Sequence, residues 1–309
     1  MFSTLQRRLA AGQKVITGEI APPRGDSRAH LEEVVARLRG SVDAVNLTDN
    51  QRGMARMSAL GAGIIVQQAG LEPIVQITGQ HRNRIALQSD VLSGSALGVH
   101  NFTCMTGDHP KNGDHPEARN VLDLNSFQII AMLRKMRDEG CFQSGVALKS
   151  APSLFIGAVA NPNIERVARV EKKIASGAEF IQTQIIFDTA RFREWMAEVR
   201  AAELHRQAFI LAGVMILRKP ETAPFLRDTL PGMRIPDAVI ERMSRAADPE
   251  REGVILAAEL VQELLSIEGI AGVHLMSIGW TRSMPMVVEQ AGLLPRPDAP
   301  GEQEPDGKV

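Results

Sequence analysis

Short apolar runs alternate with amphipathic stretches along almost the whole chain. Each run is rich in Val and Ile and ends in Gly, Pro, Asp or Asn, which is typical of buried strands. Eight strands are predicted, at residues 15–20, 42–47, 73–78, 101–105, 155–160, 180–186, 209–216 and 272–278. The intervening stretches have apolar positions at helical spacing, as Leu31, Val34, Val35 and Leu38 show. Helices are predicted at 3–11, 28–39, 54–69, 84–97, 125–139, 164–175, 190–204 and 249–267, with a broken helical region at 222–246.

This alternation defines the expected fold. Strands that alternate regularly with helices pair in parallel through right-handed crossovers. Eight such units in one chain predict an α/β protein with a single-domain (β/α)8 TIM barrel over residues 1–294. A doubly wound dinucleotide-binding sheet is disfavoured, because no GxGxxG motif follows the first strand. Residues 295–309, rich in Pro, Asp, Glu and Gly, are predicted to form a disordered tail.

Composition narrows the class of protein. The 309 residues are 44% hydrophobic and carry a net charge of −1, so no electrostatic footprint for nucleic acid or an anionic membrane is visible. Cys104 and Cys141 lack the spacing of a disulfide framework or a zinc site. The first residues contain no apolar signal core, and no stretch approaches about 18 apolar residues. We expect a soluble cytoplasmic protein that binds neither membrane nor nucleic acid.

Polar side chains gather where the predicted strands end. Members of a pair two residues apart face the same side of a strand. We therefore expect Thr106 to share a side with Phe102 and Cys104. Where a strand ends in two polar residues spaced two apart, we expect both side chains to point into the barrel mouth, where barrel enzymes keep their active sites. A shared polar ligand is the favoured explanation, because buried polar groups need partners. The polar strand ends are Glu19, Asn46, Thr48, Gln76, Thr78, Thr106, Asp108, Asn161, Gln182 and Gln184.

Two carboxyl groups among these are candidates for catalysis. Glu19 is walled by Ile20 and two prolines, so burial could raise its pKa and make it a general acid. The alternative is a salt bridge with the nearby Arg24. Asp108 follows Gly107 in the loop after the fourth strand and is placed nearest the chemistry, with a loop-capping role as its alternative.

Two other chemistries are considered and disfavoured. The repeated Gly-Asp-His-Pro at 107–110 and 113–116 suggests a metal site through His109 and His115, but proline-punctuated turns explain it well, and no metal is predicted. A Schiff base would need a lysine positioned by a strand. None of the candidate lysines lies in a predicted strand: Lys149, Lys172, Lys173 and Lys219.

Several segments together resemble the methylenetetrahydrofolate reductase family, a flavin-bearing (β/α)8 barrel. The segments include GEIAPPRG at 18–25, TGDHPKNGDHPEA at 106–118, ANPN at 160–163, KKIASGAEFIQTQIIFD at 172–188 and SIGW at 277–280. Each is weak alone, but their order and spacing span nearly the whole chain. They look most like the branch found in bacterial one-carbon pathways.

The resemblance implies roles for individual residues. Glu19 is similar in position to the family's general acid, Asp108 to its aspartate near flavin and pterin, and Gln184 to its folate-contacting glutamine. The residues implied to line the flavin are Asn46, Thr48, Gln76, Thr78, Thr106, Gly107, Asp108 and Asn161, with Lys173 at its phosphate. Those implied to contact folate or nicotinamide in turn are Leu217, Arg218, Met276 and Trp280. The cofactor implied is FAD, with FMN as the alternative.

This chain departs from the better-known branch at several of these positions. Gln76, Thr106 and Asn161 stand where that branch has His, Arg and Tyr, and Arg166 and Arg169 replace polar contacts before Lys173. The predicted activity is the flavin-dependent reduction of 5,10-methylenetetrahydrofolate to 5-methyltetrahydrofolate. The electron donor would be NAD(P)H or a partner reductase, and a homo-oligomer or a complex subunit both remain open. The alternatives are a folate-binding barrel methyltransferase, or a flavin-free subunit of a reductase complex.

Overall fold

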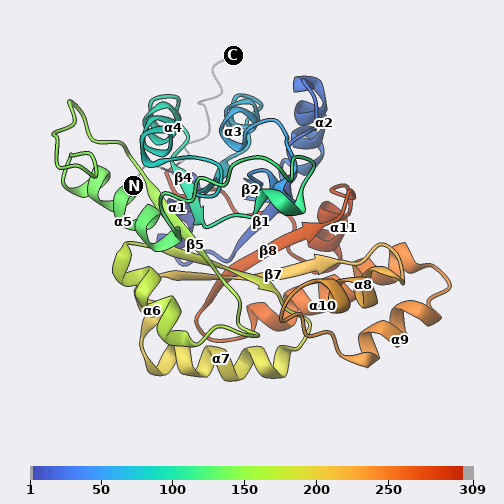
Figure 1. Cartoon of the computed structure of the whole chain (residues 1–309). Coiled ribbons are helices and arrows are strands. Elements are labelled where there is room, and N and C mark those ends of the chain that lie inside the picture. The colour runs from blue at the N-terminus through green and yellow to red at the C-terminus, as the bar shows by residue number, and fades with distance from the viewer. Residues whose placement is uncertain (1–2, 302–309) are drawn as a thin grey trace, which may run out of the picture.

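The computed structural model describes residues 3–301, and its centre is a closed barrel of eight parallel strands (Figure 1). Neighbours in the chain are neighbours in the barrel, and the last strand pairs with the first. The predicted (β/α)8 barrel is therefore confirmed. The strands are β1 (Val15–Ile20), β2 (Ala44–Leu47), β3 (Pro73–Thr78), β4 (Asn101–Met105), β5 (Phe155–Ala160), β6 (Phe180–Ile185), β7 (Phe209–Ile216) and β8 (Ile270–Ser277).

Helices pack around the barrel; α1 precedes β1, and the others follow the strands. They are α1 (Thr4–Ala10), α2 (Arg28–Leu38), α3 (Ala59–Gln68), α4 (Arg84–Ala96), α5 (Ser126–Asp138), α6 (Val167–Ser176), α7 (Thr189–Ala201), α8 (Thr222–Thr229), α9 (Asp237–Arg245), α10 (Pro249–Leu265) and α11 (Ser283–Gln290). α11 was not predicted. The helix predicted from residue 54 begins only at Ala59, because the Ser58 hydroxyl caps it by accepting the Gly61 N–H. Residues 51–53 form instead the short turn η1 (Gln51–Gly53).

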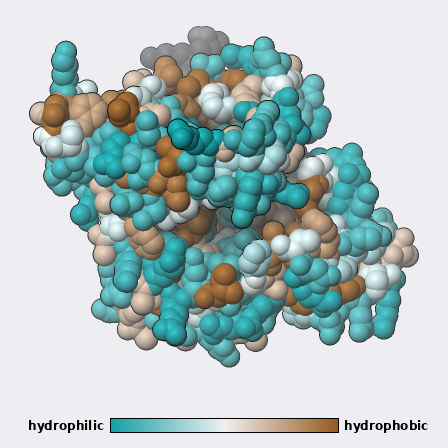
Figure 2. Space-filling model, in the orientation of Figure 1, coloured by the Kyte–Doolittle hydropathy of each residue, from teal (hydrophilic) through white to brown (hydrophobic). Residues whose placement is uncertain are grey.

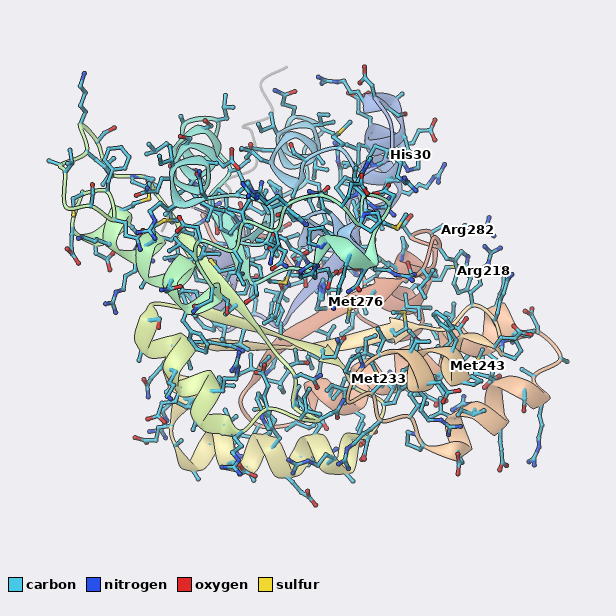
Figure 3. The ribbon with its side chains drawn as sticks, viewed as in Figure 1. His30, Arg218, Met233, Met243, Met276 and Arg282 are labelled. Atoms are coloured by element: carbon cyan, nitrogen blue, oxygen red, sulfur yellow. The ribbon has the colours of Figure 1, made fainter. Side chains whose placement is uncertain are left out.

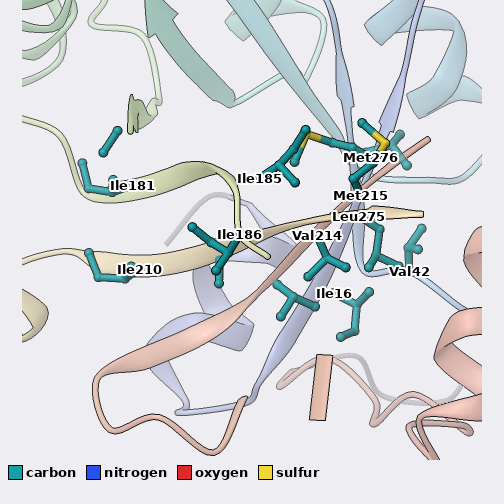
Figure 4. Packing of buried hydrophobic residues seen from close by; sticks show 14 of the residues in the cluster. Ile16, Val42, Ile181, Ile185, Ile186, Ile210, Val214, Met215, Leu275 and Met276 are labelled. Atoms are coloured by element: carbon teal, nitrogen blue, oxygen red, sulfur yellow. The ribbon is translucent and has the colours of Figure 1, made fainter. Parts of the chain in front are cut away.

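One set of alternate strand residues packs outward against the helices. Ile16, Val214 and Leu275 belong to this layer and lie close together in Figure 4. On β4 the ring of Phe102 fills the space above Gly94 of α4, where a Cβ would lie 2.8 Å from the ring. Burial of this apolar layer supplies most of the driving force for closing the barrel.

The opposite set of strand residues closes the amino-terminal end of the barrel. A separate apolar cluster, here called the plug, consists of Leu5, Leu9, Val15, Ala44, Ile74, Phe155, Phe180 and Leu211. Two of its members come from α1, which therefore caps this end. The rings of Phe155 and Phe180 lie 4.9 Å apart, and Phe180 occupies the space that a side chain at Gly157 would need. The plug therefore closes the barrel at its amino-terminal end.

The segment that follows α11 also lies at the amino-terminal side of the barrel. The Arg296 guanidinium pairs with the buried Asp43 carboxylate at 2.8 Å and donates to the Lys14 carbonyl at 2.6 Å. Ala299 is buried as well. These contacts hold residues 295–301, while 302–309 of the predicted tail lie outside the described residues. In the described part of the chain, no helix is both long and apolar enough to span a bilayer.

Candidate active site at the carboxyl end of the barrel

Above the plug, the barrel interior is polar. Asn46 of β2 and Gln182 of β6 exchange two amide hydrogen bonds, of 2.7 and 3.0 Å. The Thr103 hydroxyl of β4 also donates to the Gln182 carbonyl oxygen, at 3.2 Å. Because these strands are not neighbours, the bonds must cross the inside of the barrel. The inward direction predicted for Asn46 and Gln182 is therefore confirmed, and they form the floor of the mouth.

Glu19 is opposite Asn46 in the β1–β2 pairing and faces a buried histidine. Its Oε2 is 3.7 Å from Nε2 of His274, and only 19% of its side chain is exposed. The other ring nitrogen of His274, Nδ1, is 2.9 Å from the Thr17 hydroxyl. Thr17 and His274 sit opposite each other in the β1–β8 pairing, which fixes the ring between the two strands. Glu19 is thus a carboxyl group in a half-buried position with one imidazole partner.

The salt bridge considered between Glu19 and Arg24 is not formed, because Arg24 has another partner. Arg24 pairs with Asp114, in the loop after β4. Glu19 is therefore left with His274 as the ion-pair partner found among residues 3–301.

The predicted facing of β4 is wrong. Phe102 and Cys104 point outward into the helix-facing core, and burial raises the pKa of the Cys104 thiol. Thr103 instead faces the barrel interior. The strand ends at Met105, so alternation no longer governs the direction of Thr106, which is half-buried in the loop. The physical reason is that period-two alternation holds only while the backbone stays in the ladder.

Asp108 belongs to a long connection over residues 106–124, here called the strap. Its carboxylate is exposed and accepts the backbone N–H of Arg52 in η1, at 2.6 Å. Asp114 similarly accepts the Ala55 N–H, which with Arg24 holds the pKa of Asp114 below its usual value. Asp123 accepts three hydrogen bonds from Arg84, and these lower its pKa to about 2. Asp108, Asp114 and Asp123 thus bind the strap to the segments that follow β1, β2 and β3.

These contacts of the strap explain the repeated Gly-Asp-His-Pro motif at residues 107–110 and 113–116. Each of its aspartates accepts a backbone N–H from the loop that follows β2. His109 accepts the Lys111 N–H on Nδ1, and His115 pairs with Glu117 at 3.6 Å. Within residues 3–301, no cluster of three or more His, Cys, Asp or Glu side chains could hold a metal ion.

The ends of β2 and β3 form a buried polar corner. The Asp49 carboxylate accepts the N–H and the hydroxyl of Thr78, at 3.1 and 2.6 Å, and a bond from Arg82. Gly107 packs against this corner with φ +91°, and a Cβ there would lie 2.8 Å from the Thr78 Cβ. The other oxygen of Asp49 and the buried hydroxyl of Thr48 have no partner among the described residues. Two buried oxygen atoms of this corner, beside the mouth, are therefore available for hydrogen bonds. Gln76 is also buried there.

On the β5 and β6 side, the predicted residues have local partners. Asn161 caps its own turn by accepting the Asn163 N–H, and the Gln184 side chain accepts the Ile185 N–H. Lys173 is buried; its ammonium donates to the Val159 carbonyl at 2.6 Å and pairs with Glu165 at 2.8 Å. Burial lowers the pKa of Lys173 despite this pairing. The Lys173 ammonium is thus already held by Glu165 and the Val159 carbonyl.

A groove of about 500 Å³ lies between α5 and α6. Its cations are Arg166, Arg169 and Lys172, and the Arg169 guanidinium lies 5.1 Å from the centre of the Phe127 ring. Glu165 is the one acid in its lining. The groove thus carries an excess of positive charge, which suits a phosphorylated ligand, while the Phe127 ring is covered by Arg169.

The remaining predicted residues lie at the ends of β7 and β8. Leu217 is fully buried in the outer core, whereas Arg218 bonds to Glu250 at 2.9 Å and lies 5.7 Å from the centre of the Trp280 ring. Met276 is buried toward the centre of the molecule, as Figure 3 shows. The Trp280 indole N–H has no partner within residues 3–301.

Several residues of this site were missed from the sequence. They are Thr17, Asp49, Thr103 and His274. Thr17 and His274 share their strand parity with Glu19 and Met276, so the alternation rule applied along the full length of β1 and β8 identifies them. Asp49 carries no such signal, because its burial depends on the fold of the loop around Arg82.

The comparisons with known proteins agree with this architecture. The family model described as methylenetetrahydrofolate reductase matches residues 4–292. The chain belongs to this family. Methylenetetrahydrofolate reductase 1 of Schizosaccharomyces pombe is 27% identical over 209 residues, which are 66% of this chain and 33% of that protein. Methylenetetrahydrofolate reductase 2 of the same yeast is 20% identical over 78% of this chain and 39% of its own. The chain thus spans a third or somewhat more of these two relatives.

Similar solved structures share the barrel at low identity. One is a Clostridium thermocellum protein that binds two copies of 5-methyl-5,6,7,8-tetrahydrofolic acid, with a TM-score of 0.66 and 13% identity over 94% of this chain and all of that one. Another is a riboflavin lyase with modified FMN and riboflavin, with a TM-score of 0.56 and 9% identity over 90% of each chain. At these identities the likeness concerns the fold.

Proposed function

We propose that this protein reduces 5,10-methylenetetrahydrofolate to 5-methyltetrahydrofolate with a bound flavin. The observation that carries the proposal is the half-buried Glu19 carboxyl, held against His274 in the polar mouth of a barrel of this family. A carboxyl group beside an imidazole can gain and lose a proton where substrate binds. The structural neighbour that binds 5-methyltetrahydrofolate supports folate as the ligand class.

The residues around the mouth fit a flavin, and FAD better than FMN. Flavin offers an edge of alternating hydrogen-bond donors and acceptors, which the unpartnered Thr48 hydroxyl and Asp49 oxygen can satisfy. The absence of a side chain at Gly107 lets the strap lie close to this corner. FAD also carries a diphosphate, for which Arg166, Arg169 and Lys172 of the groove supply positive charge. When bound, flavin supplies the hydride chemistry.

The protein's own task is to control a proton and orient the folate. The five-membered ring of the substrate must open to an iminium cation before it can accept hydride, and protonation of a ring nitrogen promotes this opening. In the proposed mechanism, Oε2 of Glu19 delivers that proton, and His274 and Thr17 hold the carboxyl in place. In the same proposal Asp108, which lies in the strap, stabilises the cation and accepts pterin N–H groups, while the Gln184 amide binds the pterin. A charge-assisted hydrogen bond of this kind contributes about 1.5–3 kcal/mol.

Flavin binding tests the proposal directly. The purified protein is titrated with FAD or FMN and its visible spectrum recorded; we expect flavin bands that bleach with NAD(P)H or dithionite and return on addition of methylenetetrahydrofolate. Arg166→Gln should weaken FAD binding but leave FMN binding unchanged. Arg193→Gln, an exposed arginine of α7 paired with Glu263, is the matched control. If neither flavin binds at tens of micromolar, the flavoenzyme proposal is wrong, and a flavin-free subunit or methyltransferase becomes the better explanation.

A further inference from the structure

Strand β6 carries an extra residue where it approaches the mouth. Gln182 pairs with Leu211 of β7, and the next pair along the two strands is Ile185 with Gly213. Two residues of β6 thus stand against one residue of β7, which is the arrangement of a β-bulge. Bulges bend a strand and redirect its side chains, and they are frequent next to active sites. The two residues of this bulge are Thr183 and Gln184.

The hydroxyl of Thr183 holds the bulge in shape. Thr183 is only 4% exposed, and its Oγ1 accepts the N–H of Gly213 at 2.9 Å. The same hydroxyl donates to the Gln184 carbonyl, also at 2.9 Å. Because a bulge interrupts the ladder of backbone hydrogen bonds, the side chain takes the place of a missing backbone acceptor. One hydroxyl therefore joins the bulged backbone to itself and to the neighbouring strand.

Gly213 leaves the space that the bulge occupies. A Cβ at Gly213 would lie 2.5 Å from the Thr183 carbonyl oxygen and 2.8 Å from that of Gln184. Leu211, two residues earlier on β7, belongs to the plug inside the barrel, so alternation would point such a Cβ inward. The bulged backbone therefore bends over the inner face of β7.

The bulge also changes which residues of β6 face inward. In Figure 4, Ile185 lies near Met215, whereas Ile186 lies on the side of Val214 in the outer core. Ile185 thus takes an inward position, which strict alternation from Gln182 would give to its neighbours. The direction of the residues in the bulge depends on the shape of the bulge and not on alternation.

Gln184 is the residue that the bulge leaves accessible. It is half-exposed between two buried neighbours at the carboxyl end of β6. In Figure 2 the surface is hollowed near the centre of the view, where the strands of the barrel lie in Figure 1. The Gln184 Oε1 is held by the N–H of Ile185 at 3.0 Å, and no hydrogen bond of its Nε2 is found within residues 3–301. The amide is thus fixed at its oxygen, and its N–H groups are free to bind a ligand.

We propose that Thr183 is a positioning residue for folate binding: its hydroxyl fixes the shape of the bulge, and this shape sets the direction of the Gln184 amide. This inference rests on the proposed function, in which Gln184 binds the pterin. Without the hydroxyl, the bulge can relax and Gln184 contributes less to binding. Since the hydrogen bonds of an amide are those of a neutral group, the affinity for folate should fall about three- to tenfold.

The test compares Thr183→Val, which keeps the size of the side chain but removes the hydroxyl, with Thr183→Ser, which keeps the hydroxyl. Calorimetry measures the dissociation constant of 5-methyltetrahydrofolate, and a visible titration measures that of FAD. We expect Thr183→Val to weaken folate binding and leave FAD binding unchanged, and Thr183→Ser to bind both like the wild type. Ser41→Ala, which removes a buried hydroxyl bonded to the Leu38 carbonyl, controls for a general loss of stability.

A double-mutant cycle with Gln184→Ala shows whether Thr183 acts through Gln184. If it does, Thr183→Val should have little further effect on folate binding when residue 184 is already alanine. Equal weakening in both backgrounds would overturn the positioning role, as would equal weakening of folate and FAD binding, or a Thr183→Ser variant as weak as Thr183→Val. If Thr183→Val does not fold, Thr183→Ala, which leaves space for water at the Gly213 N–H, goes through the same cycle.

The outcomes separate the two proposals. Normal folate affinity of Thr183→Val or of Gln184→Ala would overturn the positioning role while the proposed reduction of folate stands. If wild-type protein that retains its folded circular-dichroism spectrum binds no folate, the proposed function falls and the positioning role falls with it.

Discussion

Replacement of Glu19 by glutamine separates the two chemical tasks assigned to the active site. Glutamine keeps the size of the side chain and an oxygen that faces His274, but it has no acidic proton. Reduction of flavin by its electron donor requires orientation of the two reactants and no proton delivered to folate. Reduction of methylenetetrahydrofolate requires the ring to open first. The variant should therefore impair the second half-reaction selectively.

The expected size of the effect follows from the surroundings of Glu19. Among the described residues the ion-pair partner of Glu19 is the imidazole of His274, at 3.7 Å. Loss of a general acid costs typically 10²–10⁴-fold in rate, or roughly 2.7–5.5 kcal/mol of barrier. The folate half-reaction of Glu19→Gln should slow by at least about a hundredfold, and flavin reduction by only a few-fold.

Stopped-flow absorbance in single turnover measures the two steps separately. Reoxidation of reduced flavin by methylenetetrahydrofolate reports the folate step, and bleaching by the electron donor reports the other. Glu32→Gln, which removes an exposed carboxylate of α2 paired with Arg28, controls for the loss of one negative charge. Equal slowing of both steps would show that the cofactor is misplaced. Normal rates in both would remove Glu19 from the mechanism.

Three further predictions concern the fold around the mouth. Asn46→Leu should lower the free energy of unfolding in urea by about 1–3 kcal/mol, because it strands the buried Gln182 amide; a smaller loss when Gln182 is already Leu would confirm the coupling, and additive losses would contradict it. Gly107→Ala should destabilise the protein and weaken flavin binding, since φ is +91° and the methyl group has no room; unchanged affinity would refute the close approach. The protection factors of the strap amides, which compare their exchange rates with those of an unfolded chain at the same pH, should fall as the pH drops from about 4 toward 2, because the lowered pKa of Asp123 means that its bonds to Arg84 stabilise the fold fully only above that range; Asp123→Asn should show the low protection factors already at pH 7, and equal protection in both proteins would contradict this.

The barrel was predictable because its signals are local and repeated. Each strand of the prediction lies over an observed strand, and five of the eight have the same ends, since apolar runs bounded by Gly and Pro leave little freedom. The errors are at helix starts, where Ser58 rather than periodicity decides the first residue of α3. α11 was missed because its apolar residues follow a short loop directly after β8.

The candidate site was predictable only where residues lie within strands. Alternation placed Asn46 and Gln182 correctly, because a side chain in a paired strand has one of two directions. It does not apply to Thr106 and Asp108, which lie beyond the end of β4. The partners of these loop residues are set by contacts with distant loops, as Asp108 with Arg52 and Arg24 with Asp114 show. The local sequence carries no record of such contacts.

The plug beneath the polar layer has a kinetic consequence. Because α1 and the rings of Phe155 and Phe180 close the amino-terminal end of the described barrel, a ligand of Glu19 must enter and leave at the carboxyl end. In the proposed reaction, the electron donor and the folate would both use the same face of the flavin and could not approach it from opposite ends of the barrel. Each must depart before the other arrives, so steady-state rates plotted as reciprocals against one reactant at fixed levels of the other should give parallel lines. An excess of either reactant should then inhibit the reaction, because it occupies the shared opening when the other reactant has to bind.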